Sequence, residues 1–322
     1  MGWDIPTFAD VLTARRRISP YLNSTPLYSY PVLNDLVGTE VFVKHENHQP
    51  IGAFKVRGGV NLISQLTDDE RRRGVVTAST GNHGQSIAYA ARLFGVKAVI
   101  CVPEHANPAK LASMRGLGAE LVEHGRDFDD AKAHCQELAN SRGYRYIDSG
   151  NEPHLIAGVA TSSLEIFEQE PSIEVVIVPI GGGSGASGAC LVAHAVDPSI
   201  RVIGVQSAQA PAAYRSWKER ALIEDQNETI AEGLATRAPF ELPQTILWEL
   251  LDDFVLVTDD EIQEAQLRLI DATRNMVEAA GAASTAASLK LKAELAGKRV
   301  AVVLSGGNIS RPQLQKLLAR GG

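Results

Sequence analysis

Residues 174–188 read EVVIVPIGGGSGASG, and this stretch decides the fold. The apolar run at its start is typical of a strand buried on both faces of a parallel sheet. The glycines allow a ligand to approach the backbone closely, and the Ala-rich continuation predicts a helix whose first N–H groups face the loop. Strand, loop and helix together predict a phosphate site made by Gly181, Gly182, Gly183, Ser184 and Gly185.

The same alternation of apolar runs and amphipathic stretches continues on both sides of this segment. It predicts a doubly wound α/β fold with parallel sheets. The expected strands are 96–102, 120–123, 144–147, 174–180, 201–205 and 299–304. The expected helices include 127–141 and one long helix over 259–279. Residues 208–240 have the least regular pattern, and we expect them to cover a surface.

The bulk properties indicate a two-lobed globular enzyme of 322 residues. A net charge of -7 gives no electrostatic reason to expect nucleic acid or an anionic membrane as a partner. No apolar run is long enough to span a bilayer, and the charged N-terminus lacks the apolar core of a signal peptide. Cys101, Cys135 and Cys190 are scattered, which favours reduced thiols in a cytoplasmic protein.

Three further segments have the residue types of a reactive site. Lys55, in GAFKVRGG, lies between an aromatic and an apolar residue, and desolvation there would lower its pKa and make the amine a nucleophile or base. On its own this pattern is more often a solvated lysine. The stretch STGNHG, from Ser79 to Gly84, precedes a predicted helix and favours a carboxylate site, although it could be an ordinary capped turn. Ser305 follows the strand 299–304, at the edge where ligands bind in parallel sheets.

Two other kinds of site fit less well. Gly183, Gly185 and Gly188 form a literal G-x-G-x-x-G, but a dinucleotide site would need an acid at the end of the next strand, where this chain has Gln206. His45 and His48 have a spacing that metals use, yet no cluster of cysteines or histidines completes a zinc set.

Taken in order, the segments resemble the fold-type II pyridoxal-phosphate (PLP) enzymes, and within them the serine/threonine dehydratases and serine racemases. The similarity extends over nearly the whole chain. It rests on KHENHQPIGAFKVRGG, STGNHGQ, PIGGGSG, IAEGLATR, VEAAGAA and LSGGN. The resemblance implies PLP as cofactor, two open parallel-sheet lobes, and the elimination of a β-hydroxyl that yields a 2-oxo acid and ammonia.

The resemblance also implies roles for individual residues. Lys55 would hold the cofactor as a Schiff base and take the Cα proton, with Phe54 packed beside it. Asn82 would bond the ring hydroxyl, and Ser305 the pyridine nitrogen. Gly233 and Glu278 would come near the ring. The substrate carboxylate would bind Ser79, Thr80, Gly81, Asn82 and His83, with Thr80 also a catalytic candidate.

By the same resemblance, the large lobe would comprise residues 1–73 and 152–322, and a small mobile lobe residues 74–151. We expect a homo-oligomer, as a dimer, and a catabolic role. Two departures bear on the substrate. Thr80 stands where serine racemases have a serine, and Glu232 stands where the family often has aspartate. A racemase, or a dehydratase for a bulkier 3-hydroxy amino acid, therefore stays open, as do more distantly an oxidoreductase and a non-catalytic sensor.

The resemblance carries one expectation about metals. Serine racemases of the family bind a divalent cation through a Glu at the strand end and an Asp six residues later. The matching residues here are Gln206 and Ala212, which supply neither carboxylate that a hard cation prefers. We therefore expect no divalent metal at this place.

Overall fold

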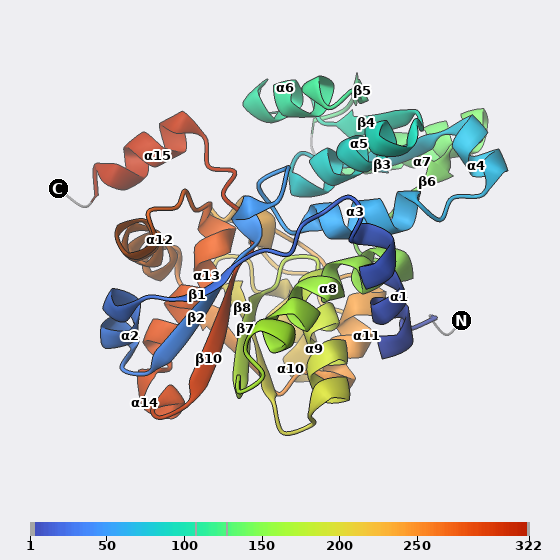
Figure 1. Ribbon diagram of the computed structural model, residues 1–322. Helices are drawn as coiled ribbons and strands as arrows, with labels where there is room; N and C mark the ends of the chain where they lie inside the picture. The colour runs from blue at the N-terminus through green and yellow to red at the C-terminus, as the bar shows by residue number, and fades with distance from the viewer. Residues whose placement is uncertain (1–3, 107, 127, 321–322) are drawn as a thin grey trace.

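The computed structural model describes residues 4–106, 108–126 and 128–320 and contains two sheets (Figure 1). The large sheet has six strands in the order β1-β2-β10-β7-β8-β9. Its strands are β1 (Leu27–Ser29), β2 (Glu40–His45), β7 (Val175–Pro179), β8 (Arg201–Ser207), β9 (Asp253–Val257) and β10 (Arg299–Leu304). Only the β1–β2 pair is antiparallel, and β10, from the end of the chain, lies between β2 and β7.

The second sheet has four parallel strands in the order β5-β4-β3-β6. They are β3 (Val75–Ala78), β4 (Ala98–Val102), β5 (Glu120–Glu123) and β6 (Arg145–Tyr146). The chain enters this sheet after β2 and returns to the large sheet at β7. The prediction of an α/β fold built on parallel sheets is confirmed.

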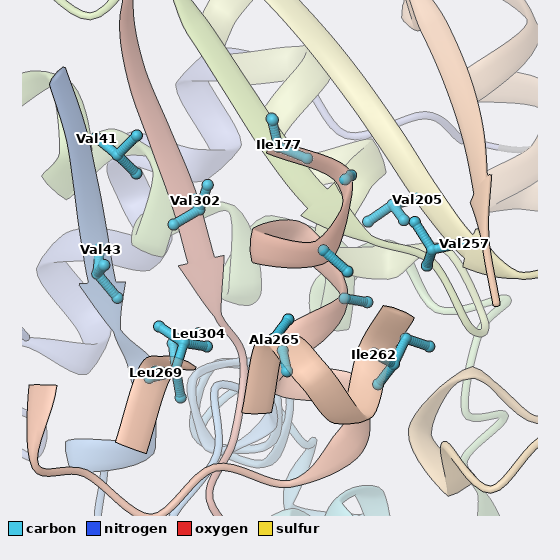
Figure 2. Packing of buried hydrophobic residues seen from close by; sticks show 14 of the residues in the cluster. Val41, Val43, Ile177, Val205, Val257, Ile262, Ala265, Leu269, Val302 and Leu304 are labelled. Carbon is cyan, nitrogen blue, oxygen red and sulfur yellow. The ribbon is translucent and has the colours of Figure 1, made fainter. Parts of the chain in front are cut away.

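Helices cover both faces of the large sheet because its strands are apolar on both sides. On one face lie α2 (Pro31–Val37), α12 (Asp259–Thr273) and α13 (Ala279–Lys290). Figure 2 shows this core, where Leu304 of β10 lies near Leu269 of α12, and Val302 and Ala265 belong to the same cluster. The other face packs against α1 (Phe8–Ile18), α8 (Pro153–Gln169), α9 (Ser184–Val196), α10 (Ala212–Glu219) and α11 (Glu241–Leu250).

The small sheet is also covered on both faces. Its helices are α5 (Asn82–Phe94), α6 (Pro108–Gly116) and α7 (Phe128–Arg142). Ala131 and Cys135 of α7 pack with Val76 and Val99, and α3 (Lys55–Ile63) packs on α5. The remaining elements are α4 (Asp68–Arg73), α14 (Lys292–Leu295), α15 (Arg311–Leu318) and two short 3-10 turns, η1 (Glu46–His48) and η2 (Glu232–Leu234).

The expected single helix over 259–279 is wrong. Helix α12 ends at Thr273, and Arg274 adopts a left-handed conformation with φ of 61° that stops the helix. The turn that follows lets the Glu278 N–H donate to the carbonyl of Gly306. The break therefore brings Glu278 to the carboxyl end of β10, which a continuous helix could not do.

The irregular segment 208–240 also contains more structure than expected, namely α10 and η2. Strands β1, β2, β3 and β9 were not predicted. Among the described residues, no helix has the length and apolar character needed to cross a membrane.

Candidate active site

Lys55 is the first residue of α3 and is fixed by the elements on either side of it. The Phe54 N–H donates to the carbonyl of Ser305 at 3.0 Å, and the Ser86 hydroxyl donates to the carbonyl of Lys55 at 2.6 Å. The Lys55 Nζ donates to Ser184 Oγ at 2.9 Å. Burial lowers the pKa of Lys55 to about 8, against the opposing charge of Asp148. An amine with this pKa is neutral in about a tenth of the molecules at pH 7, far more than an exposed lysine, so it can act as nucleophile or base.

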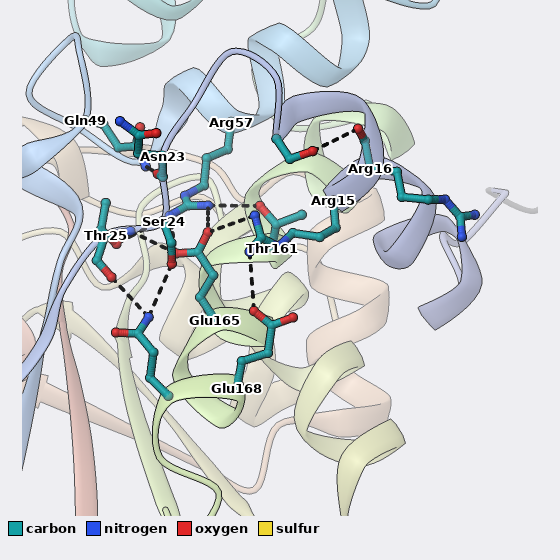
Figure 3. Close-up of polar contacts among 12 residues, drawn as sticks. Arg15, Arg16, Asn23, Ser24, Thr25, Gln49, Arg57, Thr161, Glu165 and Glu168 are labelled. Atoms are coloured by element: carbon teal, nitrogen blue, oxygen red, sulfur yellow. Dashed lines mark hydrogen bonds and ion pairs between the residues drawn. The ribbon is translucent and has the colours of Figure 1, made fainter.

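A buried ionic cluster holds the helix that carries Lys55, and Figure 3 shows the part of it in which Arg57 bonds Glu165. The Arg57 guanidinium donates to Glu46 and Glu165 at 2.7 Å each, and Lys44 Nζ lies 2.8 Å from Glu165. Burial alone would raise the pKa of Glu165, but the hydrogen bond and charge of Arg57, together with Lys44, lower it to about 2. Each carboxylate is thus paired, and the cluster ties α3 to β2 and α8.

The glycine loop leads from β7 into α9. Gly183 has φ of 87° and forms the N-cap of α9, so the turn needs a residue without a side chain. At Gly181, a Cβ would lie 2.1 Å from the carbonyl oxygen of Gly233, and at Gly185 it would lie 3.2 Å from the ring of Phe54. The first turn of α9 presents the N–H groups of Ser184 and its neighbours, which have no intrahelical partner. The glycines of the loop thus leave its backbone open to close approach, and the Ser184 hydroxyl lies beside the Lys55 amine.

Asn82, Glu278 and Asn308 form a chain of side-chain hydrogen bonds. Asn82 Nδ2 donates to Glu278 Oε1 at 2.8 Å, and Asn308 Nδ2 donates to Asn82 Oδ1 at 2.8 Å. Asn308 also donates to the Ile51 carbonyl. Burial raises the pKa of Glu278, although the bond from Asn82 and the charge of Lys110 oppose the shift. The amide of Asn82 is therefore held in one orientation by partners from two other segments.

The loop before α5 and the first turn of that helix carry several polar groups. The Ser79 hydroxyl accepts N–H bonds from Gly81 at 3.2 Å and Gly84 at 2.9 Å, so its oxygen caps the helix. The N–H groups of Asn82 and His83 come at the first two helical positions, where helices have no internal acceptor. Thr80 is partly exposed, and no hydrogen bond of its side chain is found among the described residues. The loop thus offers backbone donors to an anion.

His83 is buried, and its hydrogen bonds define its tautomer. Thr77 Oγ1 lies 2.9 Å from His83 Nε2 and donates its only hydrogen to the carbonyl of Ile147. The Nε2 atom must therefore carry the proton and donate to Thr77. Burial lowers the pKa of His83 to about 3, with a further contribution from Lys55. The remaining nitrogen, Nδ1, is an acceptor, so the donor that His83 offers a carboxylate is its backbone N–H.

A family model described as "Pyridoxal-phosphate dependent enzyme" matches residues 18–306, which include every site residue above except Asn308. The chain belongs to this family. The family resemblance, the fold-type II class and the PLP cofactor expected from the sequence are confirmed.

Relatives of this PLP enzyme include two curated lyases. L-threonine ammonia-lyase of Thermotoga maritima is 37% identical over 98% of this chain and 79% of its own length. L-threo-3-hydroxyaspartate ammonia-lyase of Saccharomyces cerevisiae is 35% identical over 98% of this chain and 97% of its own length. Among solved structures, serine racemase from Dictyostelium discoideum has a TM-score of 0.90 and 34% identity, and covers 95% of this chain and 99% of its own. The two lyase names agree with the expected class of reaction, a lyase acting on a hydroxy amino acid, and the racemase agrees with the alternative that the sequence left open.

The residues present fit the cofactor. The glycine loop suits a phosphate because it combines unpaired N–H donors with positions that a Cβ would obstruct. Ser305 is buried at the end of β10, and no hydrogen bond of its hydroxyl is found among the described residues. That hydroxyl is therefore free to pair with a neutral ring nitrogen.

Sequence reasoning missed several residues around the PLP enzyme's site. Lys110 of α6 forms an ion pair with Glu232, and Gln313 of α15 donates to the same carboxylate at 2.9 Å. These residues and Glu278 line a cavity of about 170 Å³. The IAEG motif pointed to Glu232, but nothing local pointed to Lys110, because the contact joins segments far apart in the sequence.

At the strand end where the resemblance to serine racemases would place a cation, this PLP enzyme has an internally bonded amide. Gln206 is buried, its Oε1 accepts from the Tyr214 N–H at 3.0 Å, and its Nε2 donates to Thr236 at 3.4 Å. Ala212 is the buried first residue of α10. Both functional groups of the Gln206 amide are therefore already used within the protein.

Proposed function

We propose that this PLP enzyme is a dehydratase, or ammonia-lyase, that removes the β-hydroxyl of a small 3-hydroxy amino acid and yields a 2-oxo acid and ammonia. The observation that carries the proposal is the position of the Lys55 amine. The amine is bonded to Ser184 of the glycine loop and has a pKa of about 8, and the Ser86 hydroxyl of α5 donates to the backbone carbonyl of Lys55. The names of the two lyase relatives support the same reaction.

The substrate carboxylate binds at the start of α5. The N–H groups of Asn82 and His83 supply donors there, and Ser79 fixes the loop by accepting from Gly81 and Gly84. The positive end of the helix favours the anion further. Since His83 is neutral with its proton on Nε2, its ring adds no positive charge to this pocket.

Lys55 then takes the proton from Cα as a general base. Its depressed pKa makes the neutral amine available, and Ser184 Oγ orients it from one side. The bound cofactor supplies a conjugated ring that delocalises the electrons left at Cα. The β-hydroxyl takes up a proton and leaves as water. The enamine that remains tautomerises to an imine, and hydrolysis of that imine gives the 2-oxo acid and free ammonia.

Three side chains hold the cofactor ring in this proposal. Asn82 bonds its hydroxyl, kept in place by Glu278 and Asn308. Ser305 pairs with its nitrogen as a neutral partner, which favours prompt elimination over a long-lived carbanion. Phe54 packs at its edge, and Gly233 allows the backbone of η2 to approach the glycine loop.

Racemisation is the second candidate, because a serine racemase is among the similar structures and the Thr80 side chain is partly exposed beside the carboxylate loop. Thr80 could return a proton on the face of Cα opposite Lys55. Conversion of L-serine to D-serine by the purified protein, lost in Thr80→Val, would support this activity. Unchanged inversion in Thr80→Val would exclude Thr80 from it.

The proposal extends to the whole molecule. A small lobe of residues 74–151 closes on a large lobe of 1–73 and 152–322 and excludes water from the site. The protein acts in the cytoplasm as a homodimer. Its three cysteines are free and buried, which agrees with a reducing compartment. Sedimentation velocity measures the oligomeric state.

One assay tests the reaction. Formation of 2-oxo acid is followed with serine, threonine, 3-hydroxyaspartate and 3-phenylserine in each configuration. We expect equimolar 2-oxo acid and ammonia from at least one of them, abolished by borohydride treatment. Absence of both products with all four substrates, from protein that carries its cofactor, contradicts the proposal.

A further inference from the structure

Glu232 of η2 binds two side chains that come from distant parts of the chain. Lys110 of α6 forms an ion pair with Glu232 Oε2, and Gln313 Nε2 of α15 donates to Glu232 Oε1 at 2.9 Å. Helix α6 covers the small sheet, whereas η2 packs on α13 and α15 packs on α12, which both cover the large sheet. The carboxylate of Glu232 therefore bridges the two sheets.

The bridge lies on the side of the small sheet that is remote from its covalent connections. Figure 1 shows α6 and α15 on one side of the molecule, and on the other side α4 and β6, where the chain enters and leaves the small sheet. On that connected side, Arg145 pairs with Glu70 and Glu152. A contact far from the connections acts with the longest lever against separation of the sheets. The pair of Lys110 and Glu232 has this position.

The ammonium of Lys110 needs a counter-charge where it lies. Its side chain is only 16% exposed, whereas that of Glu232 is 49% exposed. Burial lowers the pKa of Lys110, and the charge of Glu278 opposes this shift. Glu278 has a raised pKa of its own and already accepts a hydrogen bond from Asn82, so it is the poorer partner for an ammonium. Glu232 is therefore the carboxylate that offsets the burial of Lys110.

The other contacts between α6 and α15 are weak. The cavity of about 170 Å³ is lined by Lys110 of α6 and by residues of η2, α12, α13 and α15, so the elements do not close tightly on one another. Among the described residues of α15, Leu317 alone is buried, and Arg320 ties the end of the helix to Asp260 at 2.6 Å. A surface with little buried apolar area opens easily. The polar bonds to Glu232 thus supply much of the attachment here.

The backbone next to Glu232 is fixed against the glycine loop. A Cβ at Gly181 would lie 2.1 Å from the carbonyl oxygen of Gly233, so the two backbones are in contact. A Cβ at Gly233 would lie 2.7 Å from Cβ of Ala280 in α13. Because η2 is held between the glycine loop and α13, Glu232 is a firm support for the side chain of Lys110.

We propose that Glu232 is a positioning residue that holds the small sheet closed over the active site, with Lys110 as its partner and Gln313 as its support. This inference rests on the lobe closure in the proposed function and names the contact that maintains it. Closure excludes water and keeps the carboxylate loop before α5 in place opposite Lys55. Loss of the contact lowers the closed fraction and weakens substrate binding in proportion.

Removal of the Glu232 charge tests the contact. In Glu232→Gln we expect the KM of the preferred substrate to rise about fivefold, as for loss of one ion pair, with kcat changed less than about twofold. The dissociation constant of alanine, which has no β-hydroxyl to lose, should rise by a similar factor, and the visible band of the cofactor reports this binding. An unchanged KM together with an unchanged dissociation constant overturns the proposal.

A double-mutant cycle shows whether Lys110 and Glu232 act through each other. We expect Lys110→Met, Glu232→Gln and the double variant to raise KM by similar factors, because each removes the same contact. In the wild type KM should rise with ionic strength, and this dependence should be smaller in all three variants, since salt screens an exposed ion pair. Additive effects in the double variant, or an unchanged salt dependence in Glu232→Gln, would contradict the proposal.

The same helix provides a matched control. Arg115 of α6 pairs with Glu123 at 2.9 Å, and the side chain of Glu123 is 43% exposed, but both residues belong to the small sheet. Glu123→Gln removes an ion pair of α6 that does not join the two sheets, so KM and its salt dependence should stay unchanged. An effect equal to that of Glu232→Gln would show that the charge balance of α6 matters and not the bridge, which also overturns the proposal.

The contribution of α15 is tested separately. Gln313→Ala loses one hydrogen bond to Glu232 and should raise KM about twofold. An unchanged KM in this variant removes Gln313 from the proposal. If the wild-type protein releases 2-oxo acid and Glu232→Gln leaves KM unchanged, the inference fails and the proposed function stands. If the wild-type protein acts on none of the four substrates, the proposed function itself fails.

Discussion

The amine of Lys55 donates a 2.9 Å hydrogen bond to the hydroxyl of Ser184, so the reactive residue of α3 contacts the first residue of α9 directly. The two residues are far apart in the sequence, and no local pattern predicts their contact. Their contact depends on β7 and β10, whose carboxyl ends carry the glycine loop and the backbone bond from Phe54 to Ser305. Burial at this meeting point lowers the pKa of Lys55 to about 8.

We predict that Lys55→Ala abolishes turnover, because both the covalent attachment of the cofactor and the base are lost. The measurement is 2-oxo acid release, together with the visible absorption band of the purified variant. Ammonia release by this variant would contradict the proposed mechanism.

We predict that Ser305→Asp retains PLP but changes the distribution of products. A carboxylate at the end of β10 would favour protonation of the ring nitrogen. We expect this protonation to raise the share of inverted amino acid relative to 2-oxo acid. Chiral chromatography of the products and the visible absorption spectrum report the change. An identical distribution would show that this position does not control the outcome.

The buried cluster leads to a prediction about stability. Arg57→Met leaves Glu46 and Glu165 without their shared cation and should lower the free energy of unfolding by about 3–5 kcal/mol. Arg57→Lys keeps a charge but cannot reach both carboxylates in the same way, and it should lose less. Urea unfolding measures both variants, with the exposed Arg126→Met as control. Equal stability of Arg57→Met and the wild type would refute the role of the cluster.

The buried imidazole of His83 predicts a pH dependence of stability. The pKa of His83 is about 3 in the folded protein against 6.5 for an exposed histidine. Between these two pH values the unfolded chain therefore binds a proton at His83 and the folded protein does not. Stability should therefore fall as the pH is lowered through this window, with a slope approaching about 1.4 kcal/mol per pH unit from this residue. His83→Gln removes that part of the slope, whereas His194→Gln, at an exposed position, leaves it. Urea midpoints at pH values of about 6.5, 5.5 and 4.5 sample this window and show whether the stability of the wild type falls more steeply than that of His83→Gln.

Metal removal gives a further expectation. Gln206 uses both ends of its amide within the protein and Ala212 has no side-chain oxygen, so a hard divalent cation lacks two carboxylates at this place. We predict full activity after dialysis against EDTA. Reversible loss, restored by Mg²⁺, would reveal a site built from other ligands.

The glycine loop and Ser305 were predictable because each follows an apolar strand, and strand ends in a parallel sheet meet at one edge. Strand β2 was missed because Lys44 and His45 look like surface residues. Both are buried, with Glu165 and the Tyr30 hydroxyl as partners. Their burial depends on residues far away in the chain.

The same limit applies to the site. Asn82 and Glu278 were expected near the cofactor and Ser79 in the carboxylate loop. The hydrogen bonds that Ser79 accepts from its own loop, and the one from Asn82 to Glu278, appear only in the folded chain. Phe240 was within a segment expected merely to cover a surface. Its ring contacts Gly150 and Gly182 because those positions have no side chain. A pattern of apolar residues in the sequence does not predict such a contact.

The central place of β10 has a consequence for how the protein is made. Its neighbours β2 and β7 are both synthesised long before it, and each exposes an unpaired edge until Arg299–Leu304 has left the ribosome. The small sheet, by contrast, draws all its strands from one continuous stretch and can assemble early. Nascent chains should therefore carry an open large sheet through most of translation, a state in which chaperones that shield strand edges would be needed most.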